Sequence, residues 1–217
     1  MTLAIFDLDN TLIAGDSDHL WGEFVCDIGL ANSASHREKN AQFAADYRRG
    51  ELDVLAYLHF ALDPIRGMDP TQVEVLQNQF MTDYIESLML PRADALIADH
   101  RARGHTLLII TATNTVVTRP IADRLGIEHL IGCEPEIIGG CYTGASVGVP
   151  SYREGKVVRL KQWLGTHSES MADAWFYSDS HNDLPLLREV AHPVAVDPDT
   201  TLKQIADQNQ WPVISLR

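Results

Sequence analysis

The chain has 217 residues, with 30 acidic and 17 basic side chains and a formal net charge of −13 at pH 7. This acidity disfavours nucleic acid and anionic membrane surfaces as partners, because both attract basic patches. No run of about 18 or more apolar residues is present, so no membrane-spanning helix is expected. Three cysteines without metal-ligand spacing, and the lack of an export signal, predict a cytoplasmic protein, either a monomer or a homodimer.

A short buried strand is predicted at Thr2–Phe6, and a long helical segment follows from Asp16 to about Met89. Within this segment, apolar side chains recur every three or four residues, which is typical of amphipathic helices. Asp63-Pro64 and residues 67–70 predict turns between the helices.

From Pro91 onward, predicted helices alternate with predicted strands. The helices are expected at residues 91–102, 116–125, 155–164, 183–190 and 200–209, and the strands at residues 106–110, 174–177, 193–196 and 213–214. This alternation predicts an α/β fold with a doubly wound parallel sheet. Residues 1–13 and 89–217 would form this core, and residues 14–88 an inserted helical cap.

Unusual polar groups follow four predicted strand ends or loops, where a doubly wound sheet binds its ligand. They are Asp7, Asp9 and Thr11; Thr111; Lys156; and Asp179, Asn182 and Asp183. Each group alone has an ordinary explanation as a turn, a strand end or a helix cap. Together they are harder to explain in that way, because all are expected at the same edge of one sheet.

The pair Asp7 and Asp9 requires a positive charge, because an unpartnered buried carboxylate is unfavourable. No Lys or Arg is nearby in the sequence, so a divalent metal ion with oxygen ligands is the expected partner. Lys156, in a first helical turn, indicates a bound anion. A metal, a lysine and a hydroxyl around one point suit phosphoryl transfer. One carboxylate can attack phosphorus, and a second can exchange protons with the leaving alcohol and with water.

This set of residues resembles the haloacid dehalogenase superfamily, whose phosphatases carry Asp-x-Asp-x-Thr, a Thr or Ser, a Lys and an Asp-x-x-x-Asp loop in this order. The resemblance implies that Asp7 is the nucleophile and Asp9 the general acid/base. It implies phosphate or substrate binding by Thr11, Thr111, Lys156 and Asn182, and Mg²⁺ binding by Asp7, the Asp9 carbonyl and Asp179, with Asp183 in support.

The predicted cap resembles that of phosphoserine-phosphatase-like members of the superfamily. They bind the substrate ammonium with an acid nine residues after the nucleophile, here Asp16, which is equally well explained as a helix N-cap. They bind the substrate carboxylate with a cap arginine, but an ungapped alignment places Ala61 there, leaving Arg48, Arg49 or Arg66 as substitutes. We therefore expect a small phosphomonoester with an amine and no carboxylate. Histidinol phosphate, from histidine biosynthesis, fits, and phosphoserine is the alternative.

Two other functions share parts of this pattern. A phosphomutase of the same superfamily would use the same core, and a phosphorylated signalling receiver would carry a similar Asp, Thr and Lys set without a large cap. His181 is expected to point outward from its loop. The aromatic residues of the predicted cap are expected mainly in its core; they are Trp21, Phe24, Tyr57 and Phe60.

Overall fold

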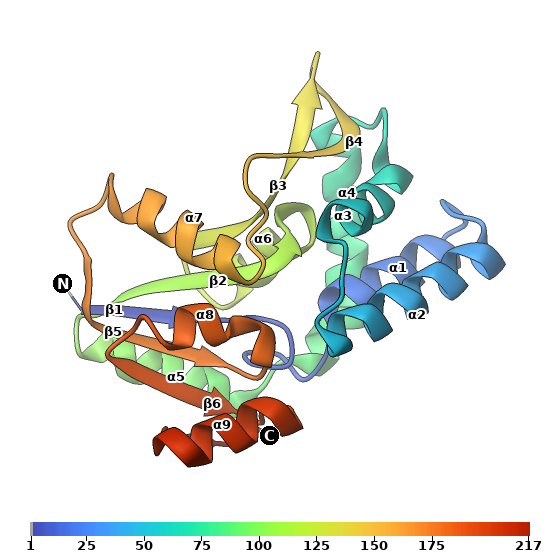
Figure 1. The fold of residues 1–217 in the computed structure, drawn as a ribbon. Helices are drawn as coiled ribbons and strands as arrows, with labels where there is room; N and C mark the ends of the chain where they lie inside the picture. Colours follow the sequence, from blue (N-terminus) through green and yellow to red (C-terminus); the bar gives the residue numbers. More distant parts are fainter. Residues whose placement is uncertain (1) are drawn as a thin grey trace.

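The centre of the protein is a seven-stranded sheet, seen in a computed structural model that describes residues 2–217 (Figure 1). The strand order is β4-β3-β2-β1-β5-β6-β7. The strands are β1 (Thr2–Phe6), β2 (Thr106–Asn114), β3 (His129–Ile138), β4 (Cys141–Val147), β5 (Ser170–Ser178), β6 (His192–Val196) and β7 (Val213–Ile214). Neighbouring strands in residues 2–217 are parallel except for β3 and β4, which form an antiparallel hairpin.

Helices cover both faces of this sheet, which explains why β1 is a continuous apolar run. Ala4 and Phe6 pack on the face covered by α5 and α6, whereas Leu3 and Ile5 pack on the face covered by α7, α8 and α9. The helices are α5 (Pro91–Ala102), α6 (Thr115–Arg124), α7 (Glu154–Leu164), α8 (Leu184–Leu187) and α9 (Thr200–Asn209). The polar ends of the strands are therefore left to form a site at one edge.

A helical insertion separates β1 from α5. It contains α1 (Ser17–Asp27), α2 (Ser33–Arg49), α3 (Val54–Leu62) and α4 (Pro70–Phe80), with short helical turns at Asp63–Ile65, Met81–Ile85 and Glu86–Leu88. At its base, Ile13 and Met89 form an isolated antiparallel bridge, so the two connections to the sheet run side by side. The predicted boundaries of the cap fall at this bridge, and the division into cap and core stays a prediction.

The helices of the insertion begin where Asp or Asn side chains accept backbone N–H groups. Asp16, Asn32, Asp53 and Asp69 are the N-caps of α1 to α4. None of the helices in residues 2–217 combines the length and the apolar character needed to cross a membrane.

The predicted elements are present, but the sequence analysis missed the β3–β4 hairpin. Pro135 argues against a strand at β3, and β4 adds an antiparallel edge to a sheet that we expected to be parallel. The hairpin also contacts the insertion, since Tyr142 N donates to Met68 O at 2.9 Å. The predicted helix at 183–190 is shorter, ending at Leu187 after a 3₁₀ turn at His181–Asp183. Strand β2 continues beyond Ile110, so Thr111 lies within it.

Candidate active site

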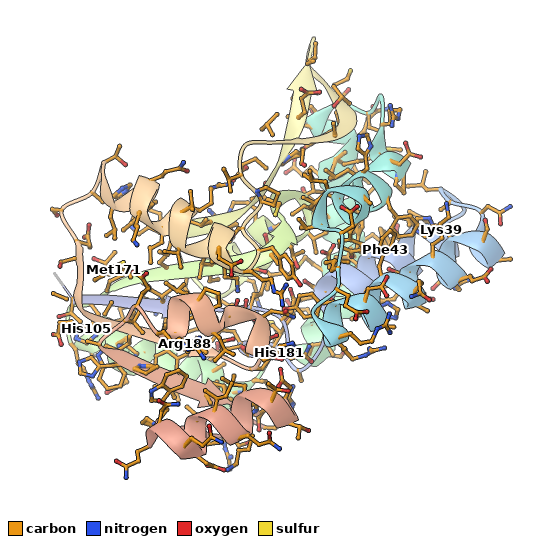
Figure 2. The ribbon with its side chains drawn as sticks, viewed as in Figure 1. Lys39, Phe43, His105, Met171, His181 and Arg188 are labelled. Atoms are coloured by element: carbon orange, nitrogen blue, oxygen red, sulfur yellow. The ribbon has the colours of Figure 1, made fainter. Side chains whose placement is uncertain are left out.

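A cavity with an empty volume of about 650 Å³ lies where the carboxyl ends of β1, β2 and β5 meet the insertion. Asp7, Asp9, Thr111 and Asp179 line it from the side of the sheet. Residues of α1, α2 and α3 line it from the insertion; Figure 2 labels one of them, Phe43 of α2. The structure thus brings the predicted residues of separate strands to one enclosed space.

Lys156 is buried in the first turn of α7 and pairs with two carboxylates. Its Nζ lies 2.8 Å from Asp7 Oδ1 and 2.7 Å from Asp183 Oδ1, and its side chain is 1% exposed. Burial alone would lower the pKa of Lys156, but Asp183 and Asp7 raise it above its ordinary value. Ser178 Oγ donates to Asp183 Oδ2 at 2.7 Å. Asp183 therefore holds the lysine, and the lysine holds one oxygen of Asp7.

Asp7 and Asp179 face each other across Thr11. Thr11 Oγ1 lies 3.4 Å from Asp7 Oδ2 and 3.3 Å from Asp179 Oδ1, and it accepts the Asp179 N–H at 3.1 Å. Burial raises the pKa of Asp7 to about 7 against the lowering effect of Lys156. Burial and the charge of Asp7 raise the pKa of Asp179 well above its usual value. One lysine is thus insufficient to neutralise these carboxylates.

These groups fit a magnesium site. Asp7, Asp179 and the Asp9 backbone carbonyl offer only oxygen donors, which Mg²⁺ prefers. The mutual repulsion of Asp7 and Asp179 is what a divalent cation between them would relieve. Within residues 2–217, no three His, Cys, Asp or Glu side chains are grouped as a complete metal site. Water or phosphate oxygens would therefore complete the coordination, as is usual for Mg²⁺.

The carboxyl group of Asp9 points toward the insertion. Its Oδ1 accepts the Ser17 N–H at 2.6 Å, and its Oδ2 accepts the Thr113 hydroxyl at 2.8 Å. Burial and the charge of Asp16 raise the pKa of Asp9 to about 6, although the hydrogen bonds oppose this shift. A carboxyl with a pKa near neutrality can both donate and accept a proton, as a general acid/base must.

The two other predicted phosphate-binding residues differ in their surroundings. Thr111 is buried beside the cavity, and its hydroxyl accepts the Thr113 N–H at 3.1 Å. The Asn182 amide instead donates to Tyr47 O at 3.0 Å and accepts the Tyr152 hydroxyl at 3.2 Å. The side chain of Asn182 therefore ties the end of α2 to the core. His181, labelled near this junction in Figure 2, pairs with Asp199 at 2.8 Å.

Asp16 is the N-cap of α1, as one of its two explanations predicted, and its role in binding the substrate ammonium stays a prediction. Its Oδ1 caps α1 by accepting the His19 N–H at 2.9 Å, and its side chain also lines the cavity. The arginines lie elsewhere: Arg49 pairs with Asp46 and Glu51, and Arg66 pairs with Asp63.

Arg48 and Arg217 line a wider depression that adjoins the cavity and shares Asp16, His19 and Asp179 with it, and Ala61 is buried within α3. Among residues 2–217, no arginine and no lysine lines the inner cavity. The inner cavity is therefore acidic on both its sheet side and its insertion side.

Sequence reasoning did not identify Asp18. This side chain is buried at 7% exposure and lines the same cavity as Asp16. An acid in the first turn of a helix is usually explained by the helix dipole, so its position gave no distinctive signal. Tyr57 also lines the cavity, in contrast to Trp21 and Phe24, which are buried in the core as expected.

Comparisons with known proteins place the chain in a family. Residues 4–188 match the model of the haloacid dehalogenase-like hydrolases. A histidinol-phosphatase of Neisseria meningitidis serogroup C (strain 8013) is 41% identical over 219 residues, which cover 99% of both chains. The crystal structure of a protein with unknown function from Bordetella pertussis Tohama I is 40% identical, with a TM-score of 0.93 and 100% of both chains covered.

A structure of a phospho-aspartyl intermediate analogue of phosphoserine phosphatase shares the fold. It is 16% identical, with a TM-score of 0.71, and the match covers 100% of this chain and 93% of that one. The chain therefore belongs to the haloacid dehalogenase-like hydrolase family, as one of its phosphatases.

Proposed function

We propose that the protein is a Mg²⁺-dependent phosphomonoesterase that hydrolyses histidinol phosphate through an aspartyl-phosphate. The observation that carries this proposal is the acidic cavity, which Asp16 and Asp7 both line and to which no arginine among the described residues 2–217 contributes. Such a cavity favours a substrate whose phosphate-free end is positively charged and carries no carboxylate.

In the proposed reaction, the free oxygen of Asp7 attacks phosphorus, and the bond from phosphorus to the alcohol oxygen breaks. Asp9 gives its proton to that oxygen, and the alcohol leaves. Asp9 then takes a proton from a water molecule that attacks the aspartyl-phosphate, so that inorganic phosphate leaves and Asp7 is regenerated.

The surrounding groups would hold the phosphoryl group during these steps. Lys156 keeps one oxygen of Asp7 in place at 2.8 Å, and the Thr111 hydroxyl is available to a phosphate oxygen. Mg²⁺ bound by Asp7, Asp179 and the Asp9 carbonyl would supply the positive charge that phosphoryl transfer requires. These roles follow from the positions of the residues and from the family resemblance.

The proposed substrate follows from charge. Histidinol phosphate has an amine and an imidazole ring but no carboxylate, so nothing in it opposes Asp16 or Asp18. The carboxylate of phosphoserine would find no arginine or lysine among the described residues that line the inner cavity, which is strongly unfavourable. The similarity to the Neisseria histidinol-phosphatase supports the same choice.

A comparison of kcat/KM for histidinol phosphate and phosphoserine, with Mg²⁺ and after its removal by EDTA, tests this proposal. We expect a preference for histidinol phosphate on the order of a hundredfold or more, since rejecting a buried unpaired charge is worth several kcal/mol. Loss of turnover in EDTA should be reversed by Mg²⁺. A preference for phosphoserine of about tenfold would overturn the substrate assignment.

A further inference from the structure

Asp18 is a buried carboxylate that the phosphoryl-transfer chemistry does not use. It lies in the first turn of α1, two residues after Asp16, and lines the cavity with a side chain that is 7% exposed. Asp18 lies close enough to Asp16 and Asp9 for their negative charges to raise its pKa. Since Asp9 would protonate the leaving oxygen, Asp18 belongs to the part of the cavity that receives the leaving group.

The protein does not supply a cation for Asp18. Within residues 2–217, its carboxylate forms no ion pair; Asn114 Nδ2 donates to it at a long 3.4 Å, and its other polar neighbours are the neutral hydroxyls of Tyr57 and Thr113. Burial and the charges of Asp16 and Asp9 raise the pKa of Asp18 well above its usual value, while the hydroxyls of Tyr57 and Thr113 oppose the rise. A buried carboxylate in this state is costly unless a ligand pairs with it.

A second polar group at the cavity is His19, one residue after Asp18. Its Nδ1 is buried and makes no hydrogen bond to any of residues 2–217. Asn114 is fixed independently, because its Oδ1 caps α6 by accepting the Val117 N–H at 3.3 Å. The Asn114 amide that donates to Asp18 is therefore fixed in place. The side of the Asp18 carboxylate that faces the cavity can bind a ligand.

Aromatic side chains form the wall beside these groups. Phe43 and Tyr57 both line the cavity, and their ring centroids are 5.2 Å apart with the rings inclined at 65° to each other. Flat apolar walls favour a flat ring, and a carboxylate at the edge of such a wall favours a ring that carries N–H groups or positive charge. An aliphatic amine alone would use the carboxylates but leave the aromatic wall without a partner.

We propose that Asp18 is a specificity-determining residue that binds the N–H of a planar, positively charged ring in the leaving group, while Asp16 binds the amine. This inference rests on the proposed function, because it assigns the two ends of the same substrate. It predicts that the enzyme recognises the imidazole ring itself, and not only the amine next to the phosphate.

Three phosphate esters separate ring recognition from amine recognition. Histidinol phosphate has the amine and an N–H-bearing ring, phenylalaninol phosphate has the amine and a ring without N–H, and 3-phenylpropyl phosphate has neither the amine nor the N–H. The ratio of kcat/KM between the first two esters measures ring recognition, and the ratio between the last two measures amine recognition. Both ratios are taken on one preparation, so they do not depend on the fraction of folded protein.

The wild-type enzyme should prefer histidinol phosphate over phenylalaninol phosphate on the order of a hundredfold, because the analogue leaves buried polar groups unpaired. Asp18→Asn should reduce this ratio by about tenfold or more and change the amine ratio by less than about threefold. Asp27→Asn is the matched control, since Asp27 lies on the same helix, is exposed and pairs with Arg37. It should leave both ratios as in the wild type.

The outcomes separate this inference from the proposed function. If Asp18→Asn keeps the wild-type ratio of kcat/KM between histidinol phosphate and phenylalaninol phosphate, Asp18 does not bind the ring and the inference fails. If the wild type shows a large amine ratio but a ring ratio near one, the inference also fails while an amine-directed phosphatase stands. If neither ratio exceeds one although the esters are hydrolysed, the proposed substrate class itself is wrong.

Discussion

Lys156 Nζ lies 2.8 Å from Asp7 Oδ1, and both side chains are almost inaccessible to solvent. The same ammonium lies 2.7 Å from Asp183, so one cation serves two carboxylates. Because no lysine or arginine among residues 2–217 pairs with Asp179 nearby, the group keeps a surplus of negative charge. Under the proposed function, Mg²⁺ bound by these carboxylates would offset that surplus and allow an acidic protein to bind a phosphate ester.

Asp7→Asn should abolish turnover. The amide cannot form an aspartyl-phosphate, and it removes a carboxylate that would hold Mg²⁺, so kcat should fall by about a thousandfold or more. Lys156 keeps Asp183 as a partner, so the variant should still fold. Phosphate release from histidinol phosphate, with circular dichroism as a check on folding, measures this. A folded variant that retains about a tenth of the activity would contradict the role of Asp7.

Mg²⁺ should stabilise the protein even without substrate. A cation that binds the folded state and not the unfolded chain adds about 2.7 kcal/mol at one hundred times its Kd. We expect Tm to rise with Mg²⁺ concentration, and the rise to be lost in Asp179→Asn. Asp173→Asn is the control, because Asp173 lies on β5, the strand that ends directly before Asp179, and is exposed. An unchanged rise in Asp179→Asn would exclude Asp179 as a metal ligand.

The residues of this site differ in whether the sequence alone can identify them, because some are positioned by the sheet and others by contacts between distant helices. Asp7, Asp9 and Asp179 were recognisable because parallel strands deliver their carboxyl ends to one edge whatever the details of packing. Lys156 was recognisable because a cation in a first helical turn opposes the helix dipole. Asp18 was not recognisable, because its burial arises from α2 and α3 closing over α1, which no local pattern encodes.

The remaining differences have similar causes. The strand β3 contains Pro135, and it becomes a strand because its hairpin is supported by β2 on one side and by the insertion on the other. The role of Asn182 as a tie to Tyr47 likewise depends on how the end of α2 meets the core. Long-range contacts decide both features, and neither strand propensity nor motif spacing includes them.

Asp18→Asn should make the substrate-free protein more stable at about pH 7. Because the pKa of Asp18 is raised in the folded state above its ordinary value of 3.8, folding is favoured below that value and disfavoured as pH rises. Removing the charge should add about 1–3 kcal/mol to the free energy of unfolding at neutral pH, and less near pH 4.

Denaturant unfolding in EDTA at about pH 4 to 7 measures this difference. Asp27→Asn should show no gain that grows with pH, since Asp27 is exposed and paired with Arg37. If the gain in the free energy of unfolding of Asp18→Asn becomes smaller toward neutral pH, burial does not destabilise the Asp18 carboxylate. A gain combined with weaker ring recognition would indicate that Asp18 is kept for function at the expense of stability.

Gly50→Ala should destabilise the junction between α2 and the loop that carries Asp179. Gly50 caps α2 with a φ of +70°, and an added Cβ would lie 2.9 Å from Arg153 Nη2 and 3.2 Å from His181 Nε2. The left-handed backbone and the close contacts both oppose the methyl group, so the free energy of unfolding should fall by about 1–3 kcal/mol. KM should also rise, because Tyr47 and Phe43 of α2 line the cavity.

Gly67→Ala separates the two causes. Gly67 has a φ of +81°, similar to that of Gly50, but an added Cβ there meets no atom within 4 Å. It should therefore show the backbone strain of about 1 kcal/mol without the rise in KM. Equal effects of the two variants on stability and on KM would mean that the approach of α2 to the loop does not shape the cavity. A larger effect of Gly50→Ala on both stability and KM would indicate that the contact of Gly50 with His181 and Asn182 shapes the cavity.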